Sequence, residues 1–185
     1  MSVNAPNEKL DWIAPKFSLI SVDNKYYNLS ELVGDNGTVV AFICNHCPYV
    51  IKIANRLALE SIELKKIGVS TIAIMSNDAN EYPEDSFENM KLFAKKYNFN
   101  FPYLHDQTQK VAKSYKAVCT PDIYGFNKHL NLKYRGRIDS GVMINNENNI
   151  KRELFYAMRL IANTNKGPLK QNYSFGCSIK WVDNE

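Results

Sequence analysis

The stretch that decides the fold is Thr38-Val39-Val40-Ala41-Phe42-Ile43-Cys44-Asn45-His46-Cys47-Pro48. Its first six residues form an uninterrupted run of strand-forming side chains, which predicts a strand buried in the middle of a sheet. The next residues place two cysteines with two residues between them, where this strand gives way to a helix. Two thiols this close can form a reversible disulfide, so Cys44 and Cys47 are a candidate redox-active dithiol.

A helix and a second strand follow the dithiol. Apolar residues recur at helical spacing from Tyr49 to Lys66, and Gly68 follows as a C′ glycine would. The run from Val69 to Met75 has no polar alternation and predicts a second buried strand. A strand, a helix and a strand in this order predict parallel pairing of the two strands.

Further elements extend this unit in both directions. Pro102 favours an edge or first-residue position for its short strand, and Asp106 is expected to cap the helix that follows it. The predicted elements are a hairpin at 17–19 and 26–29, a helical turn at 30–33, a helix at 86–97, a strand at 101–104, a helix through 111–115, a hairpin at 123–126 and 132–134, and a helix at 152–162. We expect a three-layer α/β/α sandwich with a mixed central sheet and an N-terminal β-hairpin.

Length and composition favour a single compact domain. The chain has 185 residues, and its formal charge of +4 is too small and dispersed for a nucleic-acid or membrane footprint. No stretch resembles a secretion signal or a membrane span, so we expect a cytoplasmic protein. The expected domain covers residues 1–185, with a core at 10–165 and an irregular C-terminal tail at 166–185.

The order of elements, Cys-x-x-Cys at the first βα turn and Thr120-Pro121 before the late hairpin together resemble the thioredoxin-like superfamily. The opening residues 14–29 resemble its branch of alkyl hydroperoxide reductase and thiol-specific antioxidant proteins (AhpC/TSA). Similarity to soluble redoxins of this branch lies in Phe42–Val50, Pro83–Phe87, Val118–Asp122, Tyr134–Asp139 and Gly176–Trp181. The resemblance covers residues 10–181 and implies a thiol-disulfide oxidoreductase with no cofactor beyond a Cys44–Cys47 disulfide.

The expected roles of the dithiol follow from its placement. A thiol on the first turn of a helix faces unpaired N–H groups and the positive end of the helix dipole, which favour the thiolate. We therefore expect Cys44 to be an exposed nucleophile and Cys47 to resolve the mixed disulfide. Pro48 suits a first helical turn, and Asn45 and His46 complete the motif. A His46 imidazolium would stabilise the thiolate and make the pair more oxidising, whereas a solvent-facing His46 would not.

Three further positions are candidates. The resemblance implies a cis Thr120-Pro121 bond facing the dithiol, where the backbone of Thr120 can pair with a bound peptide as an added strand. Cys119 is either a third redox thiol or a small buried apolar residue. Cys177 is either a resolving or regulatory thiol packed over the site or a structurally inert one.

Other functions remain open from the sequence. A peroxidase of the peroxiredoxin kind would need Pro-x-x-x-Thr-x-x-Cys, but Val40 and Cys44 hold the Pro and Thr positions relative to Cys47. A zinc or iron–sulfur module could use Cys44, His46 and Cys47, but no second ligand pair lies at close spacing, so we expect no metal. An inert interaction domain is the last alternative. The expected partners are protein or small-molecule thiols and disulfides, with the electron donor unidentified.

Overall fold

A mixed seven-stranded sheet forms the centre of the molecule. The structure is a computed structural model and describes residues 2–4, 10–142 and 150–182. The strand order is β3-β2-β6-β5-β4-β8-β9. The strands of this sheet are β2 (Ser18–Ser21), β3 (Tyr26–Asn28), β4 (Gly37–Phe42), β5 (Val69–Met75), β6 (Tyr103–His105), β8 (Asp122–Asn127) and β9 (Leu132–Gly136).

Parallel pairing occupies the middle of this sheet, as the sequence predicts. Strand β5 pairs in parallel with β4 on one side and with β6 on the other. The hairpin β8–β9 adds antiparallel strands at one edge, and the hairpin β2–β3 does so at the other. Every residue of β4 is buried, which agrees with its uninterrupted apolar run.

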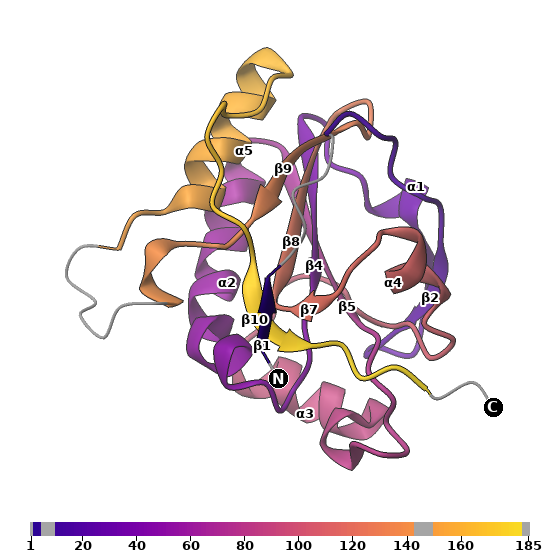
Figure 1. The fold of residues 1–185 in the computed structure, drawn as a ribbon. Helices are drawn as coiled ribbons and strands as arrows, with labels where there is room; N and C mark the ends of the chain where they lie inside the picture. The colour runs from indigo at the N-terminus through magenta and orange to yellow at the C-terminus, as the bar shows by residue number, and fades with distance from the viewer. Residues whose placement is uncertain (1, 5–9, 143–149, 183–185) are drawn as a thin grey trace.

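Helices cover both faces of the sheet (Figure 1). Residues of α2, α3 and α5 pack in one apolar cluster, and residues of α1 and α4 pack in a second cluster on the opposite face. The predicted three-layer α/β/α arrangement is therefore observed. The helices are α1 (Leu29–Leu32), α2 (Pro48–Lys66), α3 (Phe87–Lys96), α4 (Lys110–Ser114) and α5 (Glu153–Thr164), with 3-10 turns η1 (Pro83–Asp85) and η2 (Ser140–Val142).

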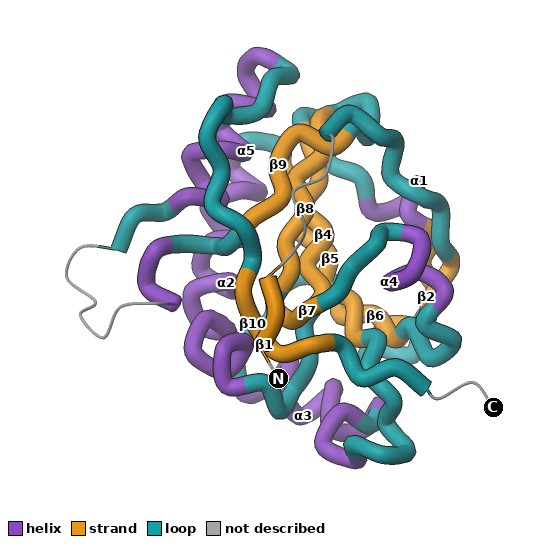
Figure 2. Tube along the Cα trace, viewed as in Figure 1, coloured by secondary structure: helices purple, strands orange, loops and turns teal. Residues whose placement is uncertain are grey.

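A second, three-stranded sheet lies beside the start of α2, and the sequence did not predict it. It contains β1 (Ser2–Asn4), β10 (Phe175–Ser178) and β7 (Cys119–Thr120), in the order β1-β10-β7. Figure 2 shows its three short strands side by side, with β10 arriving from the long loop after α5. The expectation of an irregular tail over residues 166–185 is therefore wrong for residues 175–178, because backbone pairing with β7 and β1 holds them as a strand.

The structure decides two local expectations. Strand β6 is internal, between β2 and β5, so the edge alternative for Pro102 is wrong, and Pro102 lies directly before the first residue of the strand, Tyr103. The N-cap residue of α4 is Gln109 in a left-handed conformation, not Asp106. Asp106 still accepts hydrogen bonds from the backbone N–H groups of Val111 and Ala112. Its carboxylate therefore pairs N–H groups of the first turn of α4, although it is not the N-cap residue.

Candidate active site

The dithiol lies in the loop that joins β4 to α2. Helix α2 begins at Pro48, and Cys47 is its N-cap residue. Cys44 therefore precedes the helix, and our expectation that it lies on the first turn is wrong. Pro48 accounts for this start, since proline is favoured at the first helical position, where a missing N–H leaves nothing unpaired.

Asn45 fixes the shape of this loop. Its backbone N–H donates to Asp85 Oδ1 at 2.7 Å, and its side-chain amide donates to the Glu84 carbonyl oxygen at 2.9 Å. The hydroxyl of Tyr103 donates to Asn45 Oδ1 at 2.9 Å. Because one N–H of the loop is bound to Asp85, the segment from Cys44 to His46 is held away from helical pairing.

Both sulfurs of the dithiol contact Thr120. The Thr120-Pro121 peptide bond is cis, as expected, and Thr120 directly precedes the turn into β8. Cys44 Sγ lies 3.3 Å from Thr120 Oγ1, and Cys47 Sγ lies 3.1 Å from the Thr120 carbonyl oxygen. Cys44 and Cys47 are both 0% exposed, so the expectation of an exposed Cys44 is wrong.

The surroundings favour ionisation of Cys47 over Cys44. The Cys44 thiol donates to Cys47 Sγ and lowers the pKa of Cys47 to about 5, with further help from the thiol of Cys177. The backbone N–H groups of Cys177 and Val50 also lower this pKa, whereas burial opposes them. The contact with Cys47 and burial raise the pKa of Cys44 well above its ordinary value.

One contact limits how far the pKa of Cys47 falls. A carbonyl oxygen accepts a hydrogen bond from a thiol but repels a thiolate, so the Thr120 oxygen favours protonated Cys47. Cys47 is, however, the N-cap residue of α2, where the unpaired N–H groups of the first turn favour a thiolate. The thiolate of the pair is therefore best placed on Cys47, at the positive end of α2.

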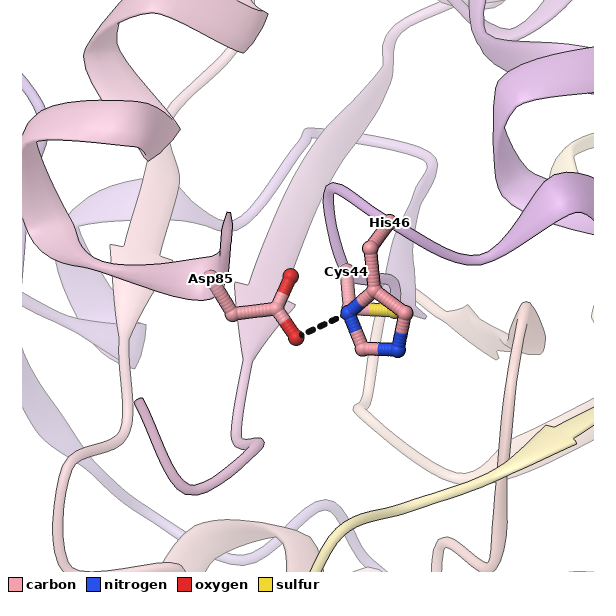
Figure 3. Close-up of side chains that lie close together, drawn as sticks. All are labelled: Cys44, His46 and Asp85. Atoms are coloured by element: carbon pink, nitrogen blue, oxygen red, sulfur yellow. Dashed lines mark ion pairs between the residues drawn. The ribbon is translucent and has the colours of Figure 1, made fainter. Parts of the chain in front are cut away.

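His46 lies against a buried carboxylate. Its Nδ1 lies 2.8 Å from Asp85 Oδ2, and Figure 3 shows the Cys44 sulfur close behind the imidazole ring. The ring also stacks on Tyr82, with centroids 5.4 Å apart. Asp85 is fully buried and accepts a further hydrogen bond from Asn77 Nδ2 at 2.7 Å. His46 is therefore held beside the dithiol and does not simply face solvent.

The same three side chains bring potential metal ligands together. One donor atom each from Cys44, His46 and Asp85 lie within 4.8 Å of one another. Both carboxylate oxygens of Asp85 are already engaged, by the Asn45 N–H on one side and by His46 and Asn77 on the other. A metal bound here would have to displace these contacts, so the arrangement fits a positioned thiol, histidine and carboxylate better than a metal site.

The other two cysteines lie on the small sheet and face different ways. Cys177 of β10 is the register partner of Thr120, so the two side chains lie on the same face of the sheet, beside the dithiol. Cys119 precedes Thr120 in β7 and points to the opposite face, where it is buried. Burial raises the pKa of Cys119 far above that of an ordinary thiol, which agrees with the inert alternative.

Strand β10 also occupies the backbone of Thr120. The resemblance implied that a bound peptide would pair there, but in the structure Cys177 of the chain itself is the pairing partner. A substrate peptide can use this edge only if β10 moves away. The C-terminal segment is thus part of the site.

Sequence reasoning missed the residues that support the dithiol from other elements. Asp85 and Tyr103 lie 38 or more residues beyond Cys47. The available signal for Asp85 was the stretch Pro83–Phe87, which matched the redoxin pattern without a role for the carboxylate. Tyr103 carries no local signal, because only the parallel pairing of β6 with β5 brings it under the loop.

The sequence profile of the AhpC/TSA family matches residues 11–152. A crystal structure of an uncharacterized conserved protein from Geobacillus kaustophilus is 41% identical, with a TM-score of 0.94, and the match covers 100% of this chain and 98% of that one. A hypothetical protein from Sinorhizobium meliloti 1021 is 32% identical, with a TM-score of 0.92, and the match covers 98% of this chain and 99% of that one.

More distant structures show the fold. The thioredoxin domain of a thiol-disulfide oxidoreductase from Bacteroides vulgatus has a TM-score of 0.59 at 15% identity, over 70% of this chain and 89% of that one. The fold is therefore thioredoxin-like, as expected. Comparison with curated proteins gave no match. No helix in the described part of the chain has the length and apolar character needed to span a bilayer.

Proposed function

The chain belongs to the AhpC/TSA family, and from that premise we propose that it is a thiol-disulfide oxidoreductase whose reacting group is the Cys44–Cys47 dithiol. The observation that carries the proposal is the position of the pair, because Cys47 is the N-cap residue of α2 and both sulfurs contact Thr120 beside the cis peptide bond. The positive end of the helix dipole stabilises a thiolate, which is the form of cysteine that attacks a disulfide. The substrates are disulfides and thiols of proteins or small molecules.

The proposed roles of the two cysteines reverse those expected from the sequence. The Cys47 thiolate attacks one sulfur of a substrate disulfide, and the other substrate sulfur leaves as a thiolate. Cys44 then loses its proton and attacks Cys47 Sγ, which expels the second substrate thiolate and closes the Cys44–Cys47 disulfide. An external thiol returns the pair to the dithiol.

His46 and Asp85 support the second step. The pKa of Cys44 is raised partly because Cys47 holds the negative charge, and that charge disappears when Cys47 enters a mixed disulfide. A ring nitrogen of His46 then lies within 4.8 Å of the sulfur that must lose its proton. Asp85 Oδ2, 2.8 Å from His46 Nδ1, holds the imidazole in place beside this sulfur.

Trapping of mixed disulfides tests both the function and the roles. Insulin reduction by dithiothreitol is measured for the wild-type protein, Cys44→Ser and Cys47→Ser. We expect the wild-type protein to accelerate the reaction and Cys47→Ser to fall to the uncatalysed rate. Cys44→Ser combined with Cys177→Ser, which removes both neighbouring thiols, should accumulate a stable mixed disulfide on Cys47. A mixed disulfide trapped on Cys44 in Cys47→Ser would instead make Cys44 the nucleophile and Cys47 the resolving cysteine. Wild-type rates in both variants would refute the proposal.

A second candidate function, thiol-dependent peroxide reduction, has one observation in its favour. The family to which the chain belongs is named for alkyl hydroperoxide reductase and thiol-specific antioxidant proteins. Cys44 stands where the peroxiredoxin pattern needs threonine, so the hydroxyl that would orient peroxide is missing from this position. Peroxide consumption with dithiothreitol as the donor, measured beside insulin reduction, separates the two candidates.

A further inference from the structure

Cys177 reaches the dithiol from the opposite end of the chain. Strand β10 pairs antiparallel with β7, and this register sets Cys177 opposite Thr120. Thr120 contacts Cys44 Sγ through its hydroxyl and Cys47 Sγ through its carbonyl oxygen. Cys177 packs against the apolar cluster that contains Cys44 and Cys47, and its thiol is among the groups that lower the pKa of Cys47.

The position of β10 is built by several independent contacts. A Cβ added to Gly176 would lie 1.9 Å from the Thr120 carbonyl oxygen, so only glycine allows this close approach to β7. Phe175 packs edge-on against Tyr49 of α2, with ring centroids 5.0 Å apart. Beyond the strand, the Ile179 N–H donates to the Val118 carbonyl oxygen at 3.0 Å. These contacts hold the Cys177 thiol against the active site.

The three thiols differ in access to solvent. Cys44 and Cys47 are fully buried, whereas Cys177 is only partly buried. A disulfide between Cys44 and Cys47 is therefore shielded from an external thiol. A disulfide that includes Cys177 joins one of these buried cysteines to a residue that is partly open to solvent.

We propose that Cys177 is a third redox thiol, which takes the disulfide from the buried Cys44–Cys47 pair and presents it to an external thiol. The inference rests on the proposed function of that pair. Cys177 loses its proton and attacks Cys47 Sγ, the Cys44–Cys47 bond breaks, and Cys44 leaves with the electron pair and takes up a proton. This exchange leaves the oxidation state of the protein unchanged and needs no added oxidant.

The next step returns the protein to its reduced form. An external thiolate attacks Cys177 Sγ and expels Cys47, which leaves as a thiolate at the start of α2, where the helix dipole stabilises its charge. A second external thiol then releases Cys177. Burial and the contact with Cys47 raise the pKa of Cys177 to about 11 in the reduced protein, and the charge of Lys180 opposes this rise. Once Cys47 is in a disulfide its thiolate no longer opposes ionisation of Cys177.

Disulfide mapping tests whether the bond forms. Trypsin cleavage after Lys and Arg separates the dithiol, in Tyr26–Lys52, from Cys177, in Gln171–Lys180. Cys44→Ser is oxidised with diamide, alkylated and digested. We expect a cross-linked pair of these two peptides, and a minor amount of the same pair from the wild-type protein. Absence of the pair from both, while the wild-type protein still forms its Cys44–Cys47 disulfide, would overturn the inference.

Re-reduction kinetics test whether the bond is used. Oxidised wild-type protein, Cys177→Ala and the control Cys119→Ala are mixed with reduced glutathione. We expect Cys177→Ala to be reduced more slowly by on the order of tenfold, and Cys119→Ala at the wild-type rate. Equal rates for all three would overturn the relay role of Cys177. A wild-type protein that forms no disulfide would instead refute the proposed function of the dithiol.

Discussion

The loop after β4 and the strand β10 bring cysteines to the same sulfur, Cys47, by different means. The loop is local: Cys44 and Cys47 are separated by two residues, and Pro48 starts the helix directly after them. Strand β10 arrives from 130 residues further along the chain and is held by backbone pairing with β7. The loop thiols are buried, whereas the β10 thiol is partly open to solvent.

This difference divides the tasks of a redox site between two regions. The loop supplies the helix N-terminus and the His46–Asp85 pair, which act on the charge of the sulfurs. Strand β10 supplies a neighbouring thiol and closes the edge of β7. A change in the loop should therefore alter the charge and reactivity of the sulfurs. A change in β10 should alter the assembly of the site.

The largest expected effect is on the pH dependence of Cys47 alkylation. Between pH 8 and pH 6 an ordinary thiol with a pKa of about 8.5 loses reactivity by about 10²-fold. Because the pKa of Cys47 is lowered to about 5, its alkylation by iodoacetamide should stay nearly constant over this range and decline only toward pH 5. Mass spectrometry of the Tyr26–Lys52 peptide measures the rate at Cys47.

Two variants connect this profile to the two regions. The Cys44 thiol is the largest cause of the lowered pKa and the Cys177 thiol a smaller one. The midpoint should therefore rise more in Cys44→Ala than in Cys177→Ala, and Cys119→Ala should keep the wild-type midpoint. A larger rise of the midpoint in Cys177→Ala would show that β10, not the loop, mainly controls the pKa of Cys47.

The same pKa predicts how the stability of the reduced protein depends on pH. The folded chain has a lower pKa at Cys47 than the unfolded chain, so the unfolded chain binds more protons between pH 5 and the ordinary thiol pKa. The contribution of Cys47 to stability is therefore present above that ordinary pKa and is lost as the pH falls through about 5. Urea unfolding of reduced wild-type protein and Cys47→Ser across this range checks the sign.

A smaller effect is expected from Gly176→Ala, which disturbs the strand alone. The new Cβ would meet the Thr120 carbonyl oxygen at 1.9 Å, so β10 must shift from β7. We expect a loss of about 2–3 kcal/mol in the free energy of unfolding, measured by urea denaturation. Cys177→Ala, on the same strand but partly exposed, is the control and should lose less. Wild-type stability in Gly176→Ala would show that β10 is not locked against β7.

The sequence predicted the local part of this comparison well. The apolar run of β4, the helical periodicity after Pro48 and the alternation of the hairpins depend on neighbouring residues, and these elements are found close to their predicted bounds. Strand β10 was missed because Phe175–Ser178 carries no alternating pattern, and its pairing with β7 depends on a close approach at Gly176. Contacts between distant segments leave little trace in a local pattern.

Contacts between distant segments also limited what the sequence predicts about the candidate active site. The dithiol and the cis Thr120-Pro121 bond were predicted, but the helix start was placed one turn too early. As a result, the prediction assigned to Cys44 the helix N-terminal environment that Cys47 has in the structure. The cause is Asp85 of η1, whose carboxylate accepts a hydrogen bond from the Asn45 N–H. No sequence pattern around the cysteines predicts this contact.

The smallest expected effect concerns His46, which tests the loop side without removing a thiol. An imidazolium beside the dithiol stabilises the thiolate form and thus the reduced protein, which makes the pair more oxidising. The wild-type reduction potential should therefore lie above the value of about −270 mV for thioredoxin.

In His46→Gln we expect the reduction potential to fall by about 30 mV, a tenfold change in the equilibrium with glutathione. The charge of Asp85 would still raise the pKa of Cys44 in this variant, which acts in the same direction. His129→Gln, at an exposed position, is the matched control and should keep the wild-type potential. An unchanged or higher potential in His46→Gln would remove His46 from the control of the dithiol and leave that control to the helix N-terminus and the neighbouring thiols.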